Sequence, residues 1–230
     1  MIGVENAPES HCGKDGSPPH TTIDETPVSA ETPYIALQFS DPSKFDLVVP
    51  GLAFNSRGQS YHPDETKYPF EQVYVANNFT DTAASINAKL AEGLHLVLQP
   101  GFYNLTEALQ VTKKNQVVLG IGFATLNSAG NNSCIEVANV DGVRIAGIIF
   151  QADRNNSESL LQWGVRDQGQ YQNESYAGNS SNPGVMHDIF ARVGGYNYES
   201  EYEVSTTYMV LINSGNVIID NTWLWRADHG

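Results

Sequence analysis

The sequence predicts an all-β protein, and within that class a parallel β-helix with an N-terminal capping helix. Short apolar runs recur between Asn, Asp and Gly turn residues, and a single helical pattern precedes most of them. Strands such as residues 117–119 are apolar at every position, which is typical of parallel sheets covered on both faces. A β-sandwich, the competing architecture, would show apolar and polar residues in alternation.

The N-terminal third has two parts. Residues 1–32 are rich in Pro, Ser, Thr, Glu and Asp without apolar periodicity, so we expect a disordered lead-in that carries no chemistry. Residues 33–79 are expected to form strands and a loop that pack on the β-helix. Within them, residues 33–39 and 45–50 have strand patterns, separated by the turn-forming Asp41 and Pro42.

The predicted capping helix lies at the start of the β-helix, which we expect over residues 80–230. Thr80 and Asp81 offer an N-cap, residues 83–91 have helical apolar spacing, and Gly93 supplies a stop.

After this helix, four strands resemble copies of one structural unit, and they can be aligned on Val117, Val143, Val185 and Val217. Their irregular spacing suits a β-helix, because its turns accept insertions without disturbing the stacked coils. Polar residues 153–183 are predicted to be such an insertion, built over a coil around Leu160.

Composition restricts the partners. The formal net charge is −14, which argues against nucleic acid and anionic membranes and favours a neutral ligand. The N-terminus lacks the basic start and apolar run of a signal peptide, but several glycosylation acceptors indicate a secreted, extracellular or cell-wall glycoprotein. These acceptors are Asn78, Asn104, Asn131, Asn155, Asn173 and Asn179.

No cofactor or metal site is expected. The two cysteines, Cys12 and Cys134, provide no disulfide framework and no zinc spacing, and Cys134 lies in an apolar run typical of a core residue. Asn and Asp residues in turns could bind Ca²⁺ without any recognisable motif. The full-length protein is expected to be a monomer that binds polysaccharide.

Residues 81–126 resemble the opening of pectate-lyase-like β-helix proteins. The shared features are the capping helix, the Pro-Gly-x-Tyr turn at residues 100–103, and the Gly-x-Gly strand ending at residues 120–122. The resemblance implies a right-handed, single-stranded parallel β-helix of the pectin-lyase-like type. It says much less about the reaction, because this scaffold carries lyases, hydrolases, epimerases and non-catalytic binding proteins.

The last stretch, residues 220–230, is similar to secreted microbial β-helix proteins of the α-1,3-glucanase (mycodextranase) group of glycoside hydrolases. Some related chains are labelled adenylyl cyclase, but the sequence has no phosphate-binding Gly-Lys-Ser/Thr loop to support that activity. The resemblance implies that the chain is an N-terminal fragment and that further coils follow Gly230.

Glycoside hydrolysis needs two carboxyl groups, so acidic residues on predicted strands are the catalytic candidates. These are Asp228, Asp220 and Asp188. Asp228 ranks first because aromatic, basic and histidine side chains surround it in sequence. The candidates for binding substrate are Trp223, Trp225, Arg226, His229 and Asp153. Trp223 and Trp225 should share one face of their strand, with Arg226 on the other.

Each candidate also has a purely structural interpretation, since Asx residues commonly occupy β-helix turns and aromatic side chains fill gaps between loops. The sequence favours a glycoside hydrolase acting on a neutral glucan. A non-catalytic glycan-binding or structural module is the alternative. A pectin-type polysaccharide lyase is a second alternative, disfavoured because few basic residues are available to neutralise uronate carboxylates.

Overall fold

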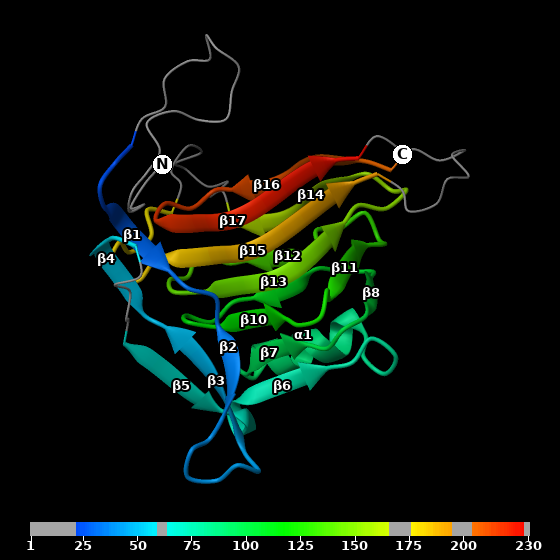
Figure 1. Ribbon diagram of the computed structural model, residues 1–230. Coiled ribbons are helices and arrows are strands. Elements are labelled where there is room, and N and C mark those ends of the chain that lie inside the picture. The colour runs from blue at the N-terminus through cyan, green and yellow to red at the C-terminus, as the bar shows by residue number, and fades with distance from the viewer. Residues whose placement is uncertain (1–21, 59–63, 166–175, 195–203, 228–230) are drawn as a thin grey trace.

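The computed structural model describes residues 22–58, 64–165, 176–194 and 204–227. Figure 1 shows strands stacked in parallel layers, with a smaller group of N-terminal strands on one side. This is the predicted parallel β-helix. None of the helices among these residues is long and apolar enough to cross a membrane.

The main sheet runs in the order β17-β15-β13-β10-β7-β6, and every neighbouring pair in it is parallel. Its strands are β6 (Val73–Ala76), β7 (His95–Leu98), β10 (Val117–Gly120), β13 (Arg144–Gln151), β15 (Gly184–Val193) and β17 (Val217–Arg226). Two short strands, β8 (Phe102–Leu105) and β11 (Thr125–Ser128), extend it beside the second half of β13.

A second parallel sheet forms the opposite wall of the coil, in the order β16-β14-β12-β9. Its strands are β9 (Leu109–Val111), β12 (Ile135–Val137), β14 (Ser157–Trp163) and β16 (Thr206–Ile212). Between the two walls lies a continuous apolar core, in which Phe150 and Trp163 are the largest fully buried side chains. The polar stretch predicted as an insertion therefore contributes β14 to this wall.

Helix α1 (Ala83–Ala91) closes the N-terminal end of this core through Ala83, Ile86 and Leu90. Its N-cap is Thr82, whose side chain forms a capping box with Ser85, so the cap lies just after the predicted pair Thr80 and Asp81. Asp81 accepts hydrogen bonds from Tyr74 and Asn77 instead, which ties the helix to the end of β6.

The N-terminal residues form two small antiparallel sheets. Strand β1 (Thr26–Ala30) pairs with β4 (Leu52–Ser56), whereas β2 (Tyr34–Leu37) and β5 (Glu65–Pro69) both pair with β3 (Phe45–Pro50); a short 3-10 helix, Phe70–Gln72, precedes β6. Strand β1 lies inside the segment predicted to be disordered, because β4 provides its backbone partners. Strand β6 belongs to the main sheet, although it precedes the predicted start of the β-helix.

The β2-β3-β5 sheet covers the outer side of the first coils. Leu47 of β3 is fully buried in a second apolar cluster with Val97, Val117 and Leu119, and Ala146 of β13 belongs to the same cluster. Strands β7 and β10 are therefore buried on both faces. This explains why Val117–Leu119 are continuously apolar.

The strand register corrects the alignment of the predicted repeats. Val117 pairs with Arg144, Arg144 with Val185, and Val185 with Ile218. The alignment on Val143 and Val217 was wrong by one residue in each of those two strands. A shift of one residue exchanges the two faces of a strand, and both valines in fact pack against the inner core.

Cys134 is fully buried, and its thiol is free and donates to the carbonyl of Leu126. Burial raises the pKa of the Cys134 thiol, which makes it an unreactive core residue. Cys12 lies outside the residues that the structure describes.

Candidate functional site

A line of left-handed residues crosses the main sheet and divides its outer face in two. Gly147, Asp188 and Asn221 have φ values of 68°, 52° and 46° and occupy equivalent places in β13, β15 and β17. In the strand register, residues 146, 187 and 220 form the row before these positions, and residues 148, 189 and 222 form the row after them. We call these three positions the corner. The N-terminal segments cover the outer face before the corner. We call the outer face after the corner, where Trp223 is 66% exposed, the open face.

After the corner, alternate residues point away from the core. Ile189 and Ala191 belong to the inner core, so Phe190 and Arg192 face outward. Their partners in β17 are Trp223 and Trp225. We call Phe190, Arg192, Trp223 and Trp225 the aromatic face.

The aromatic face is a compact group of rings. The ring centroid of Phe190 lies 5.5 Å from that of Trp223 and 6.1 Å from that of Trp225, to which it is stacked at 19°. The guanidinium of Arg192 lies 5.5 Å above the Trp225 ring. Trp223, on the edge strand β17, is 66% exposed, so its indole presents a large apolar surface to solvent.

A row of polar side chains continues the outer face after the corner toward the earlier coils, where Asn127 and Gln151 are buried. Asn104, Asn127, Gln151 and Arg192 occupy successive positions of one register row that ends at Trp225. Asn127 is only 3% exposed and donates to Asn104 Oδ1 at 2.9 Å and to Asp153 Oδ2 at 2.7 Å. The other oxygen of Asp153 accepts from a backbone amide, so its carboxylate is held in one orientation. We call Asn104, Asn127, Gln151 and Asp153 the polar row.

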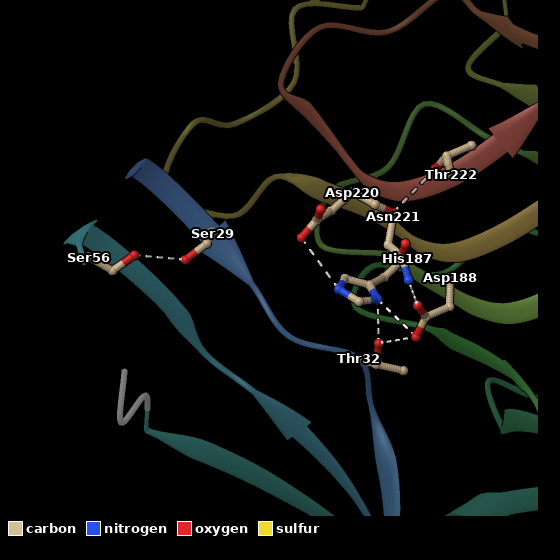
Figure 2. A network of polar contacts seen from close by, with 8 residues as sticks. All are labelled: Ser29, Thr32, Ser56, His187, Asp188, Asp220, Asn221 and Thr222. Carbon is tan, nitrogen blue, oxygen red and sulfur yellow. Dashed lines mark hydrogen bonds and ion pairs between the residues drawn. The ribbon is translucent and has the colours of Figure 1, made fainter. Parts of the chain in front are cut away.

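A second polar group lies at the corner itself (Figure 2). His187 is enclosed by Asp188 Oδ2, 3.1 Å from Nδ1, and Asp220 Oδ2, 3.4 Å from Nε2. Thr32, which follows β1, contacts His187 Nδ1 and donates to Asp188 Oδ2 at 2.7 Å. Asn221 donates to the other oxygen of Asp188. We call these five residues the corner cluster.

The electrostatics of Asp188 favour its ionised form. Burial alone would raise the pKa of Asp188, but hydrogen bonds from Thr32 and Asn221 and the neighbouring His187 outweigh it, so the pKa is lowered. A carboxyl group with a lowered pKa is a poor proton donor near neutral pH. Asp188 therefore suits a structural or electrostatic role better than that of a general acid.

Comparisons with known proteins assign the fold to a family. Residues 73–230 match the model of the LAM55 pectate lyase-like domain. The chain belongs to this family. It thus has the right-handed pectate-lyase-like β-helix that its opening residues predicted.

The LAM55 chain is similar to an exo-beta-1,3-glucanase from Streptomyces sp. (strain SirexAA-E / ActE), with 35% identity over 231 residues. That alignment covers 99% of this chain and 35% of the relative. The solved structure of sacteLam55A from Streptomyces sp. SirexAA-E matches with a TM-score of 0.83 and 34% identity. A variant of the same protein in complex with glucose matches with a TM-score of 0.82 and 36% identity. Each structural match covers 100% of this chain and 39% of the other.

The LAM55 chain therefore spans little more than a third of the length of these relatives. The comparisons support the pectate-lyase-like superfamily and a glucan-hydrolysing relative. They do not support the expected likeness to the α-1,3-glucanase group or the adenylyl cyclase label, because the relative is a β-1,3-glucanase.

The structure brings some predicted site residues together and separates others. Trp223 and Trp225 share the aromatic face, with ring centroids 6.4 Å apart. Asp188 and Asp220 meet at the corner through His187, and Asp153 belongs to the polar row. Arg226 ends β17 on the opposite face from Trp225. Asp228 and His229 lie outside the described residues.

Four residues of the site were not identified from the sequence. They are Phe190 and Arg192 of the aromatic face, and Asn127 and Gln151 of the polar row. The repeat of the coils could have identified them. In the strand register, equivalent outward positions are occupied by Ile149 and Gln151 in β13, Phe190 and Arg192 in β15, and Trp223 and Trp225 in β17. Over the described ranges no group of three or more His, Cys, Asp or Glu side chains is arranged to hold a metal ion.

Proposed function

We propose that this chain is part of the β-helix of a secreted glycoside hydrolase that acts on a β-1,3-glucan by carboxylate acid/base chemistry. The aromatic face is the observation that carries the proposal, and the 35% identity with an exo-beta-1,3-glucanase supports the choice of linkage. A neutral glucan also suits a chain with a net charge of −14.

In this proposal the open face binds glucose units of the substrate. Trp223 provides an exposed flat apolar surface for the C–H face of a pyranose ring, and Phe190 packs against both indoles. Trp225, which contacts Phe190 and Arg192, extends this surface. In the polar row, Asn104 is exposed and Asp153 is partly exposed, so these two can provide an amide and a carboxylate for sugar hydroxyls, whereas Asn127 and Gln151 are buried. Asp153 is well suited to that role, because Asn127 already fixes the direction of its carboxylate.

The hydrolysis itself needs a proton donor and a second carboxylate. Asp228 remains our proposed catalytic acid or base, because it directly follows the aromatic strand in sequence. Ala227, the residue before it, still donates to the carbonyl of Val193 at 2.7 Å and so continues the sheet. The hydrogen bonds to Asp188 make that residue a weaker catalytic candidate. Asp220 is also a weaker candidate, because its carboxylate contacts His187.

The test is a substrate panel with the full-length protein. We expect glucose to be released from β-1,3-glucan, and not from α-1,3-glucan, β-1,4-glucan or polygalacturonate. Release should be lost in Asp228→Asn while binding to β-1,3-glucan is retained. Unsaturated uronides from polygalacturonate would indicate a lyase, and binding to β-1,3-glucan without any product would indicate a non-catalytic module; either result would contradict the proposal.

Secretion is proposed on separate grounds. Asn131, Asn155 and Asn179 are glycosylation acceptors with exposed side chains in turns, where an attached glycan would not clash with the stacked coils. Expression of the full-length protein through a eukaryotic secretory pathway should yield a species whose mass falls on treatment with an N-glycosidase. Loss of the mass difference in the Asn131→Gln, Asn155→Gln, Asn179→Gln triple variant would place the glycans at these positions, whereas an unchanged mass in the wild type would contradict their use.

A further inference from the structure

Three exposed apolar rings lie on the connections that follow the first strands of the main sheet (Figure 1). Phe79 follows β6, Pro100 joins β7 to β8, and Phe123 joins β10 to β11. Phe79 is 89% exposed and Phe123 is 83% exposed, and Pro100 is exposed as well. We call these three residues the turn platform.

The three connections are stacked on one another. A Cβ atom built on Gly101 would lie 2.4 Å from Asn78 Oδ1, so the connection after β7 touches the one after β6. A Cβ atom built on Gly122 would lie 2.6 Å from Pro100 Cγ, so the connection after β10 touches the one after β7. The two phenylalanines therefore belong to the first and third of three layers, which are spaced by about 4.8 Å.

The exposure of Phe123 does not arise from an unpaired end of the sheet. Its connection lies between the one that carries Pro100 and strand β13, because the amide of Ile149 donates to the carbonyl of Ala124 at 3.0 Å. The neighbours of Phe123 are packed: Ala124 is fully buried in the inner core, and Ile121 packs against the second apolar cluster. Only the side chain of Phe123 is directed into solvent at this connection.

The backbone holds both phenylalanines in their exposed positions. Gly122 and Phe123 have φ values of 57° and 63°, a conformation that is unfavourable for a bulky side chain. The amide of Phe79 donates to Asn77 Oδ1 at 2.9 Å, and the carbonyl of Asn77 accepts from the amide of Thr80. A surface fixed in this way loses little conformational freedom when it binds a ligand.

The composition of these connections suits a neutral sugar polymer. Thr80 and Gln99 place a hydroxyl and an amide in the same turns as the rings. The connections contain no acidic, basic or histidine residue over residues 77–80, 99–101 and 121–124. Pyranose rings combine apolar C–H faces with a rim of hydroxyl groups, so they match apolar rings beside uncharged hydrogen-bonding groups.

The turn platform adjoins one end of a register row that reaches the aromatic face. Phe102 and Thr125, which follow the connections of Pro100 and Phe123, pair in the row that continues through β13 and β15 to Trp223. The row passes from β8 through β11, β13 and β15 to β17, which is roughly 19 Å at the usual strand spacing. A long glucan chain can contact both surfaces, whereas a short oligosaccharide contacts one.

We propose that the turn platform is a second glucan-binding site, which holds long β-1,3-glucan chains on the molecule while the open face binds the segment to be hydrolysed. The identity of the polymer rests on the proposed function. Two linked sites raise the apparent affinity for a long chain and leave the binding of a short one unchanged. The turn platform is thus separate from the residues proposed for catalysis.

Co-sedimentation of the full-length protein with insoluble β-1,3-glucan tests the proposal. The double variant Phe79→Ala, Phe123→Gly should bind the polymer about tenfold more weakly, while its kcat/KM for the β-1,3-linked trisaccharide stays within about twofold of the wild-type value. Glycine is chosen at position 123 because it adopts a positive φ without strain. Phe123→Trp keeps a flat ring and should retain polymer binding.

Phe54→Ala is the matched control. Phe54 is 61% exposed and lies on β4, in the separate sheet of β1 and β4, so its removal should leave polymer binding unchanged. Polymer binding that is unaltered in the double variant would overturn the proposal, and so would an equal loss of activity on the trisaccharide. Lower stability without weaker polymer binding would show that another part of the chain covers the platform, and would also contradict it.

Failure of the proposed function would give a different result. In that case the wild type would bind the polymer through the turn platform and release no glucose from polymer or trisaccharide. Loss of polymer binding in the double variant would then still support the second site.

Discussion

Gly184 lies directly against the indole of Trp163: a Cβ atom built on Gly184 would lie 2.3 Å from Trp163 Cζ2. Trp163 is 1% exposed and belongs to the inner core, so the ring has no free space into which it could move. The first residue of β15 and the last residue of β14 therefore fit only when position 184 has no side chain.

Gly184→Ala should destabilise the protein by about 2–3 kcal/mol, because overpacking a closed core forces side chains and backbone to shift. Denaturant unfolding of the full-length variant measures the loss. Gly93→Ala is the matched control: nothing lies within 4 Å of a Cβ at Gly93, so only its positive φ of 93° opposes the change. Its cost should be about 1 kcal/mol. Equal losses in the two variants would contradict the packing argument.

His95 should make stability depend on pH. It is 7% exposed, its Nδ1 accepts from the amide of Val117, and burial lowers its pKa to about 4. Between about pH 6.5 and pH 4 the unfolded chain binds a proton at His95 that the folded chain does not, so stability must fall as pH falls. The loss should reach about 2–3 kcal/mol by pH 4 and then level off.

The measurement for His95 is denaturant unfolding at pH 7 and pH 4.5. His95→Asn retains a side-chain acceptor near the position of Nδ1 but cannot titrate. The wild type should lose about 2 kcal/mol more than this variant between the two pH values. If both proteins lose the same amount, His95 is not the responsible group.

Trp223→Ala should weaken binding of β-1,3-glucan oligosaccharides by roughly tenfold, because the substitution removes an exposed aromatic surface at the edge of the open face. The change should appear in KM, with kcat altered less. Leu224→Ala is a suitable control, since Leu224 is 50% exposed but points to the opposite face of β17. A larger effect in Leu224→Ala than in Trp223→Ala would exclude this face as the binding surface.

Asn127→Asp should be strongly destabilising at neutral pH. The amide nitrogen of Asn127 lies 2.7 Å from Asp153 Oδ2, and the substitution would replace this donor by a second, nearly buried carboxylate. The expected loss is about 2–4 kcal/mol at pH 7, smaller once acid protonates either carboxyl group. Thermal unfolding at pH 7 and pH 4 would measure both effects.

Asn104→Asp is the control for that experiment, because the side chain of Asn104 is exposed and already accepts the hydrogen bond from Asn127. It should change stability by less than about 0.5 kcal/mol. A comparable loss in both variants would show that added charge alone, and not the contact with Asp153, causes the effect.

Much of the fold could be predicted because it depends on local patterns. The helix, its Gly93 stop and the strands of residues 45–50 and 117–120 follow from periodicity and turn residues. The register could not be predicted, since apolar residues stand at neighbouring positions in several of these strands, such as Val117 and Val118 or Val217 and Ile218. Val143 and Val185 look equivalent in sequence, yet Val185 pairs with Arg144.

The site was predictable only in part for a related reason. Trp223 and Trp225 stand out because they are two residues apart on one strand. Phe190 and Arg192 come from the preceding coil and become visible only with the correct register. Thr32 lies 155 residues before His187, and no local pattern indicates a contact at that separation.

The apolar cluster that includes Leu47 of β3 and Ala146 of β13 has a consequence for synthesis on the ribosome. Leu47 and Ala146 are about 100 positions apart in the chain. At translation rates of roughly 5–20 residues per second, Ala146 is therefore synthesised about 5–20 s after Leu47. During that interval the N-terminal hairpin exposes the surface that will later cover the coils. A chaperone that binds short apolar strands would find its first target there, and the emergence of β13 would end that exposure.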